Sequence, residues 1–239
     1  MKSQNLKKLA LALSVPLILF SCLKEEEQVL QVTTDAYMVK KLVGGQPAYG
    51  LAFYAYANKI LKSGTVARTG GVGDTINLIA YPLSVYTLFK EPAETTLSEN
   101  MPLDGEYIFN ITAESGETNE SSDELNLNDI DIPDILSTEV STNGDRLDMK
   151  WTKVSGADGY VVKLADEDGE YIYSSNTKAP NDTTLKISPL TGVWVEPFEV
   201  GNTYTIEVNA FAYEDDSNNQ NAVFNVEEIS IGSKSIVWE

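Results

Sequence analysis

The sequence has no histidine and a single cysteine, Cys22, among its 239 residues. Catalysis by a Ser-His-Asp or a Cys-His arrangement needs an imidazole base, so these enzyme classes are excluded. Zinc sites built from histidine and cysteine ligands are excluded for the same reason. One cysteine cannot form a disulfide within the chain, so the folded state must be stabilised by burial of a hydrophobic core.

Basic residues are also scarce. The chain has 17 Lys and Arg against 36 Asp and Glu, a net charge of −19, and loss of residues 1–21 with their three lysines would leave −22. Phosphate groups would be repelled, so nucleic acid is not an expected partner. The charge is uneven, because residues 33–113 carry a net −1 and residues 114–239 a net −19. This asymmetry suggests two units with different surfaces.

The N-terminal residues have the pattern of a secretory signal peptide. Three lysines precede an apolar run over residues 9–20, which is too short to span a bilayer as a helix. The run ends in "LFSC", residues 19–22, which resembles a bacterial lipobox. The resemblance implies that residues 1–21 are removed and that Cys22 carries fatty acyl chains, palmitate among them, which anchor the protein to a membrane.

The residues after Cys22 indicate on which side of the membrane the protein is expected. The sequence "LKEEE", residues 23–27, is similar to the acidic surface-export signals of lipoproteins in the Bacteroidetes, and its alternative interpretation is a solvated tether. With the lipobox, it implies a tether over residues 22–32 and an outer-membrane location, lipid-anchored and facing the cell exterior.

The rest of the chain predicts an all-β fold. After residue 30, no segment keeps apolar positions at helical spacing for three turns, and short β-branched and aromatic runs alternate with turn-forming residues. In a first unit, residues 33–132, we expect strands at 36–42, 48–57, 75–81, 85–90 and 106–113. The acidic stretch that follows predicts a hairpin with a loop over 114–123 and a last strand over 124–130, or alternatively a disordered linker.

The second unit, residues 133–239, resembles a fibronectin type III domain. The resemblance rests on "LDMKWTKVSGADGYVVKLADEDG", residues 147–169, and on "FEVGNTYTIEVNAFA", residues 198–212. It implies that Trp151 is a core residue and that Tyr204 forms a tyrosine corner. In the first unit, "LDGEYIFNI" (residues 103–111) is similar to the approach to the penultimate strand of an Ig-like domain. The expected architecture is two tandem β-sandwich domains, Ig-like and then fibronectin type III-like.

Two groups of residues are candidate sites. Asp129, Asp131 and Asp134 lie where the two sandwiches would join, and their carboxylates could share a cation such as calcium; the alternative is ordinary solvated linker charges. No other cofactor is expected. The sequence "ADEDGE", residues 165–170, has a glycine too early for an EF-hand loop and predicts a turn.

The other candidate site is an irregular segment around Trp194. An indole there could be an exposed platform for a sugar ring, with Glu196 and Glu199 accepting hydrogen bonds from its hydroxyl groups. The alternative is a plug that covers the core.

The sequence therefore predicts a non-catalytic, surface-anchored lipoprotein that binds or presents a ligand, as a glycan-binding accessory to outer-membrane uptake. Polysaccharides and uptake proteins are the expected partners besides the membrane. The alternative is a structural adhesin or fimbrillin-like subunit, for which Arg68 would be the proteolytic site.

Overall fold

The computed structural model describes residues 28–71, 75–214 and 225–239, which form an all-β fold. The expected signal peptide (residues 1–21), Cys22 and the expected export signal (residues 23–27) lie outside the described residues. The first half contains β1 (Val32–Val43), β2 (Gln46–Ala57), β3 (Leu61–Arg68), β4 (Ile76–Tyr81), β5 (Ser84–Lys90), β6 (Gly105–Ala113) and β7 (Thr118–Leu125), with one 3-10 helix, η1 (Glu94–Thr96). The second half contains β8 (Ile135–Val140), β9 (Leu147–Trp151), β10 (Gly159–Ala165), β11 (Tyr171–Ser174), β12 (Thr184–Ile187), β13 (Val193–Trp194), β14 (Thr203–Tyr213) and β15 (Val226–Val237). None of the described segments forms a helix long and apolar enough to cross a membrane.

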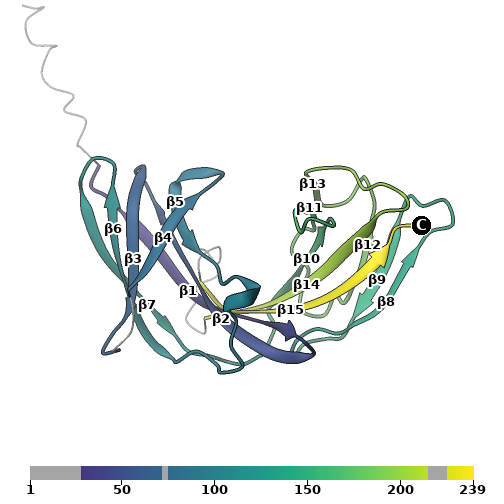
Figure 1. The fold of residues 1–239 in the computed structure, drawn as a ribbon, viewed down its shortest axis with the longest axis horizontal. Coiled ribbons are helices and arrows are strands. Elements are labelled where there is room, and N and C mark those ends of the chain that lie inside the picture. Colours follow the sequence, from purple (N-terminus) through teal and green to yellow (C-terminus); the bar gives the residue numbers. More distant parts are fainter. Residues whose placement is uncertain (1–27, 72–74, 215–224) are drawn as a thin grey trace, which may run out of the picture.

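The strands form two sheets. Twelve are hydrogen-bonded in the order β13-β11-β10-β14-β15-β1-β2-β5-β4-β3-β6-β7, and a second sheet has the order β12-β9-β8. In Figure 1 the molecule is U-shaped, with β4 and β5 on one arm and β10, β11 and β13 on the other. The outer side of one arm is formed by β3, β6 and β7, and that of the other by β8, β9 and β12 (Figure 1). The inner side of the U is therefore lined by the part of the long sheet that runs from β13 to β4, while its β3-β6-β7 end forms the outer side of the first arm.

The first hydrophobic core lies between the two layers of the first arm. Strand β6 shows how it forms, because Tyr107, Phe109 and Ile111 are buried while the residues between them are more exposed. This is the period of two that a half-buried strand requires. The Tyr107 hydroxyl donates to the backbone oxygen of Leu103 at 3.0 Å, so this tyrosine closes the turn before β6.

The second core lies in the other arm, and it confirms both residue roles that the fibronectin type III resemblance implies. Trp151 is 1% exposed and packs edge-on against Tyr160, with ring centroids 5.5 Å apart. The Tyr204 hydroxyl accepts a hydrogen bond from the backbone N–H of Glu199 at 2.8 Å, which is the geometry of a tyrosine corner. Trp238 is fully buried, and its indole N–H donates to the backbone oxygen of Gly144 at 2.7 Å.

The two arms share a seam, formed by the parallel pairing of β1 with β15. Four residue pairs form this seam, running from Met38 opposite Glu228 to Lys41 opposite Ile231. Strand β15 also pairs with β14 along its whole length, and β1 pairs with β2 in the same way. The strand pairing therefore runs without a break from one arm into the other, a feature that the sequence did not predict.

Two expectations for the first unit need correction. Strand β3 was not predicted, because "LKSGTVAR" mixes polar residues and glycine with its apolar positions. The predicted loop over residues 114–123 is in fact a tight turn, and β7 begins at Thr118. The prediction was wrong because β7 consists mostly of polar and acidic residues. Such residues suit a strand at the end of a sheet, where one face is open to water.

Candidate functional site

An aromatic face lies on the inner side of the first arm. We define it as Tyr54, Tyr56, Ile79, Tyr81 and Phe89, from β2, β4 and β5. Tyr56 and Ile79 are 44% and 54% exposed, and the other three are half-buried. These residues alternate along their strands with core residues such as Phe53, which is buried on the opposite face.

The rings of the aromatic face contact one another. The centroid of Phe89 is 5.8 Å from that of Tyr54 and 5.2 Å from that of Tyr81. On its other side, Tyr54 stacks on Tyr37 of β1 at 6.0 Å. The Tyr54 hydroxyl donates to Glu91, and burial together with this bond raises the pKa of Tyr54. The hydroxyl is therefore held as a protonated donor to a carboxylate at the border of the face.

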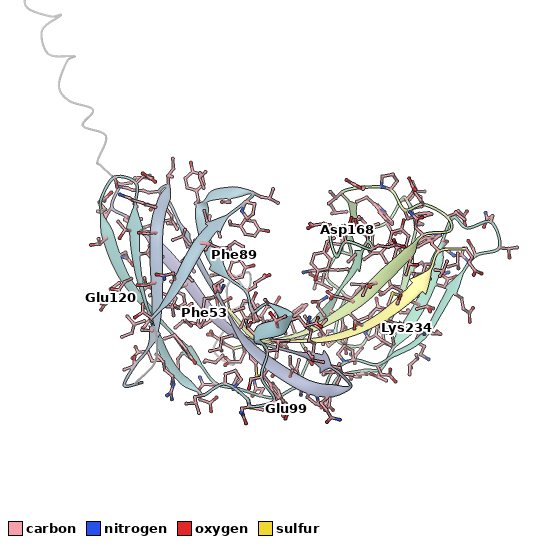
Figure 2. All side chains as sticks on the ribbon, viewed as in Figure 1. Phe53, Phe89, Glu99, Glu120, Asp168 and Lys234 are labelled. Carbon is pink, nitrogen blue, oxygen red and sulfur yellow. The ribbon has the colours of Figure 1, made fainter. Side chains whose placement is uncertain are left out.

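The second arm places a smaller polar group opposite. Figure 2 labels Phe89 on the first arm and Asp168, next to β11, on the other. On β11, the Tyr171 hydroxyl donates to Glu207 at 2.6 Å, and the Lys163 ammonium lies 4.5 Å from the centre of the Tyr171 ring. Burial, then the bond and charge of Glu207, and then the charge of Glu91 raise the pKa of Tyr171. Glu91 belongs to the first arm, so polar groups of the two arms are within electrostatic range of each other.

Trp194, the predicted platform, is half-buried at the end of the second arm. Its ring lies between Tyr173 and Phe198, with centroid distances of 4.7 and 5.6 Å, and its N–H donates to the backbone oxygen of Ser188 at 3.0 Å. Phe198 in turn stacks on Trp238 at 3.9 Å. These contacts favour the plug interpretation, although Trp194 still borders a surface pocket of about 250 Å³.

The two glutamates predicted to assist Trp194 are only partly brought together with it. Glu196 lines the same pocket as Trp194. Glu196 and Glu199 both line a neighbouring pocket of about 330 Å³, together with Asp166 and Asp168 from the "ADEDGE" turn. The structure thus places an apolar pocket and an acidic pocket side by side, with Glu196 bordering both.

The predicted junction carboxylates do not meet around a common point. Asp129 forms an ion pair with the buried Lys40 at 2.7 Å, and the Lys40 ammonium also donates to the backbone oxygen of Ile130 at 2.9 Å. Asp131 and Asp134 are exposed. The backbone of Asp129 has a φ of 49°, a left-handed conformation that aspartate tolerates in turns. Asp129 therefore neutralises a buried lysine instead of facing its two neighbours.

A different carboxylate cluster lies at the seam, formed by Asp35 of β1, Asp123 of β7 and Glu214, which follows β14. One carboxylate oxygen from each residue lies within 4.8 Å of those of the other two. Burial, followed by the charge of Asp123, raises the pKa of Asp35 to about 9. Burial also raises the pKa of Asp123 to about 7, and that of the nearby Glu227 to about 7. Acidic charge is thus concentrated where the arms join.

Sequence reasoning missed both the aromatic face and the carboxylate cluster. A signal for the first was the alternation in "AFYAYA", residues 52–57, where tyrosines occupy the positions between core residues. A signal for the second was Asp35, the one acidic residue of β1, which lies within a run of buried positions. The partners of Asp35 are 88 and more residues away in the sequence, so their proximity could not be read from it.

No family model matches the chain, and no curated protein matches it in sequence. Among solved structures, a two-domain fibronectin type III segment of chicken tenascin is similar with 12% identity and a TM-score of 0.30, covering 88% of this chain and 98% of that one. The FN1–FN3 domains of chicken CNTN1 give 11% identity and a TM-score of 0.32, covering 89% of this chain and 67% of that one.

A third similar structure is the BSP domain of a biofilm-associated protein, with 12% identity and a TM-score of 0.26. The match covers 87% of this chain and 30% of that one. The fold is defined by the strand pairing and the two hydrophobic cores.

Proposed function

We propose that the protein is a lipid-anchored, non-catalytic surface module that binds a neutral glycan on the inner side of its U. The observation that carries this proposal is the aromatic face. Sugar rings have apolar C–H faces that pack on aromatic rings, and their hydroxyl groups need nearby acceptors. Tyr56 and Tyr81 supply the rings, while Glu91 at the border of the face and Glu207 on the opposite arm supply acceptors.

The net charge narrows the class of glycan. A chain with 36 acidic and 17 basic residues repels polyanions, so an acidic polysaccharide is the weaker candidate. The exposed apolar area also supports an interaction surface, because soluble domains rarely leave such patches uncovered without a function. A module of this kind would serve as an accessory to outer-membrane uptake.

The test is affinity electrophoresis of the protein in gels that contain neutral polysaccharides. We expect at least one polysaccharide to retard the parent. Tyr56→Ala and Tyr81→Ala should each weaken that binding about fivefold or more, because truncation of a central aromatic contact costs over 1 kcal/mol. Trp194→Ala is the matched comparison, since it removes an aromatic ring from the other candidate site.

Each outcome separates two interpretations. If Trp194→Ala loses retardation while both tyrosine variants are retarded like the parent, the site lies at the end of the second arm and the proposal is contradicted. Absence of retardation by every neutral polysaccharide would favour the alternative, a structural adhesin or fimbrillin-like subunit. That alternative has little support from Arg68, whose guanidinium Nε donates to the backbone oxygen of Asp104 at 2.9 Å.

The anchor is tested separately. Cys22→Ala should release the protein from membrane fractions or leave an uncut precursor, because the acyl chains attach at that sulfur. Replacement of residues 24–27 by neutral residues should hide the protein from protease added to intact cells. A normally processed Cys22→Ala chain that still partitions into membranes would contradict the lipid anchor.

A further inference from the structure

The carboxylate cluster joins parts of the chain that belong to different arms. Asp35 and Asp123 lie on strands that pack around the first core, whereas Glu214 follows β14 of the second arm. Hydrogen bonds fix the first two side chains in place. Asp123 accepts from the backbone N–H of Ala36 at 2.7 Å, and the Oδ2 atom of Asp35 accepts from that of Val226 at 3.3 Å.

One oxygen of Asp35 is left without a partner. The residue is only 2% exposed, and its Oδ1 atom is enclosed with no hydrogen-bond donor among the described residues. A buried acceptor that gains no partner on folding loses its hydration without compensation. The charged side chains that act on Asp35 are all acidic, namely Asp123, Glu214 and Glu227.

Among the described residues, no lysine or arginine side chain neutralises the acidic charge around Asp35. Lys40 is the one buried cation in the described part of the chain, and it pairs with Asp129. Neither Asp35 nor Asp123 takes part in an ion pair between described residues. A cation from solution would supply the missing charge and the missing partner for Asp35.

We propose that Asp35, Asp123 and Glu214 bind one calcium ion, which ties the end of β14 to β1 and β7. Calcium takes oxygen ligands at about 2.3 to 2.6 Å, so ligand atoms on opposite sides of the ion are about 4.6 to 5.2 Å apart. The cluster's oxygens, all within 4.8 Å of one another, can therefore surround one such ion. Carboxylates without histidine or cysteine favour a hard cation over a transition metal. This inference is independent of the glycan proposal.

The experiment uses the full chain, stripped with EGTA and exchanged into chelator-free buffer. Calcium chloride is titrated to about 10 mM, because extracellular modules bind calcium at about 0.1 to 1 mM. We expect calorimetry to show one calcium per chain, and the melting temperature to rise with each further increase in calcium. No binding heat and no shift in melting temperature at the end of the titration would overturn the proposal.

Two variants locate the site. Asp35→Asn keeps the size of the side chain and removes its charge, so calcium affinity should fall about tenfold or more, since changes even beyond the ligands cost about 10- to 100-fold. Without calcium, Asp35→Asn should melt close to the parent's temperature at neutral pH, because the raised pKa of Asp35 leaves its carboxyl uncharged there and the amide has the same size. This second readout separates a lost ligand from a damaged fold.

Asp131→Asn is the matched control. It makes the same charge change at an exposed carboxylate near the seam and should keep the parent's calcium response. An Asp35→Asn response equal to the parent's would contradict the site. An equal rise in melting temperature with magnesium chloride would contradict the choice of calcium.

Discussion

Gly232 is the position at which the structure makes its sharpest prediction about stability. It lies on β15 opposite Val208 of β14, one residue after the last pair of the seam. A Cβ atom added to Gly232 would lie 1.8 Å from the backbone oxygen of Pro133 and 2.9 Å from its carbonyl carbon. Ordinary contact begins at 3.4 Å, so Gly232→Ala requires a backbone displacement of about 1.6 Å.

Neither strand β15, which carries Gly232, nor the segment that contains Pro133 can move without a cost in stability. Strand β15 is held by β14 on one side and by β1 on the other. The segment that contains Pro133 also carries Ile130, whose oxygen binds Lys40 and whose side chain is part of the second core. Overpacking costs about 1 to 3 kcal/mol and occasionally more, and a clash between two backbone segments belongs at the upper end. We therefore expect Gly232→Ala to lower the free energy of unfolding by about 3 kcal/mol.

Thermal and urea unfolding measure this effect. For a chain of this size, 1 kcal/mol shifts the melting temperature by about 2 to 4 °C, so Gly232→Ala should melt roughly 6 to 12 °C below the parent. Gly71→Ala is the control, because its added Cβ would lie 3.4 Å from the nearest atom, the backbone oxygen of Arg68. We expect Gly71→Ala to stay within about 0.5 kcal/mol of the parent. If Gly232→Ala melts within about 2 °C of the parent, the placement of Pro133 over β15 is wrong.

Three further changes test the cores and the seam. Trp151→Ala should cost about 3 to 5 kcal/mol in urea unfolding because the indole is fully enclosed, and parent-like stability would refute its core role. Tyr204→Phe should cost only about 1 kcal/mol, the value of one hydrogen bond, and a loss as large as that of Trp151→Ala would show that the hydroxyl does more than close a turn. Glu228 is fully buried within range of the charges of Lys40 and Asp129, and burial raises its pKa to about 7. The folded state then binds its proton more tightly than the unfolded state, so stability should fall by up to about 3 kcal/mol as pH rises from about 4.5 to 7. Glu228→Gln should flatten this part of a pH series of unfolding measurements, and an unchanged slope would contradict the shift.

Local pattern predicted much of the fold. The alternation in β6 places that strand within one residue of where it lies, and the turn predicted over residues 165–170 connects β10 to β11. Trp151 and Tyr204 could be assigned because their environments are built by neighbouring residues in the same motif. Local pattern did not predict strand β7. Its acidic composition is typical of a loop, and it forms a strand because it pairs with β6.

The candidate sites were less predictable, because they depend on contacts between distant segments. Trp194 was identified as a ring in an irregular segment, but whether its N–H meets solvent or Ser188 is decided by packing. Asp129 could be identified as a junction carboxylate, yet Lys40, 89 residues away, determines what it binds. The alternating tyrosines of β2 were visible in the sequence, and they gained meaning only when β4 and β5 placed further rings beside them.

The seam connects the two proposals physically. Four residue pairs of parallel sheet are a small contact for holding two arms at a fixed angle, and parallel pairing is slightly less stable per residue than antiparallel pairing. The carboxylate cluster adds repulsion at that same point, because Asp35, Asp123, Glu214 and Glu227 act on one another there. A bound cation would turn that repulsion into attraction between β14 and the strands of the first arm. The aromatic face and Tyr171 lie on the two arms that this seam joins, so the charge of the seam bears on the surface that we propose binds the ligand.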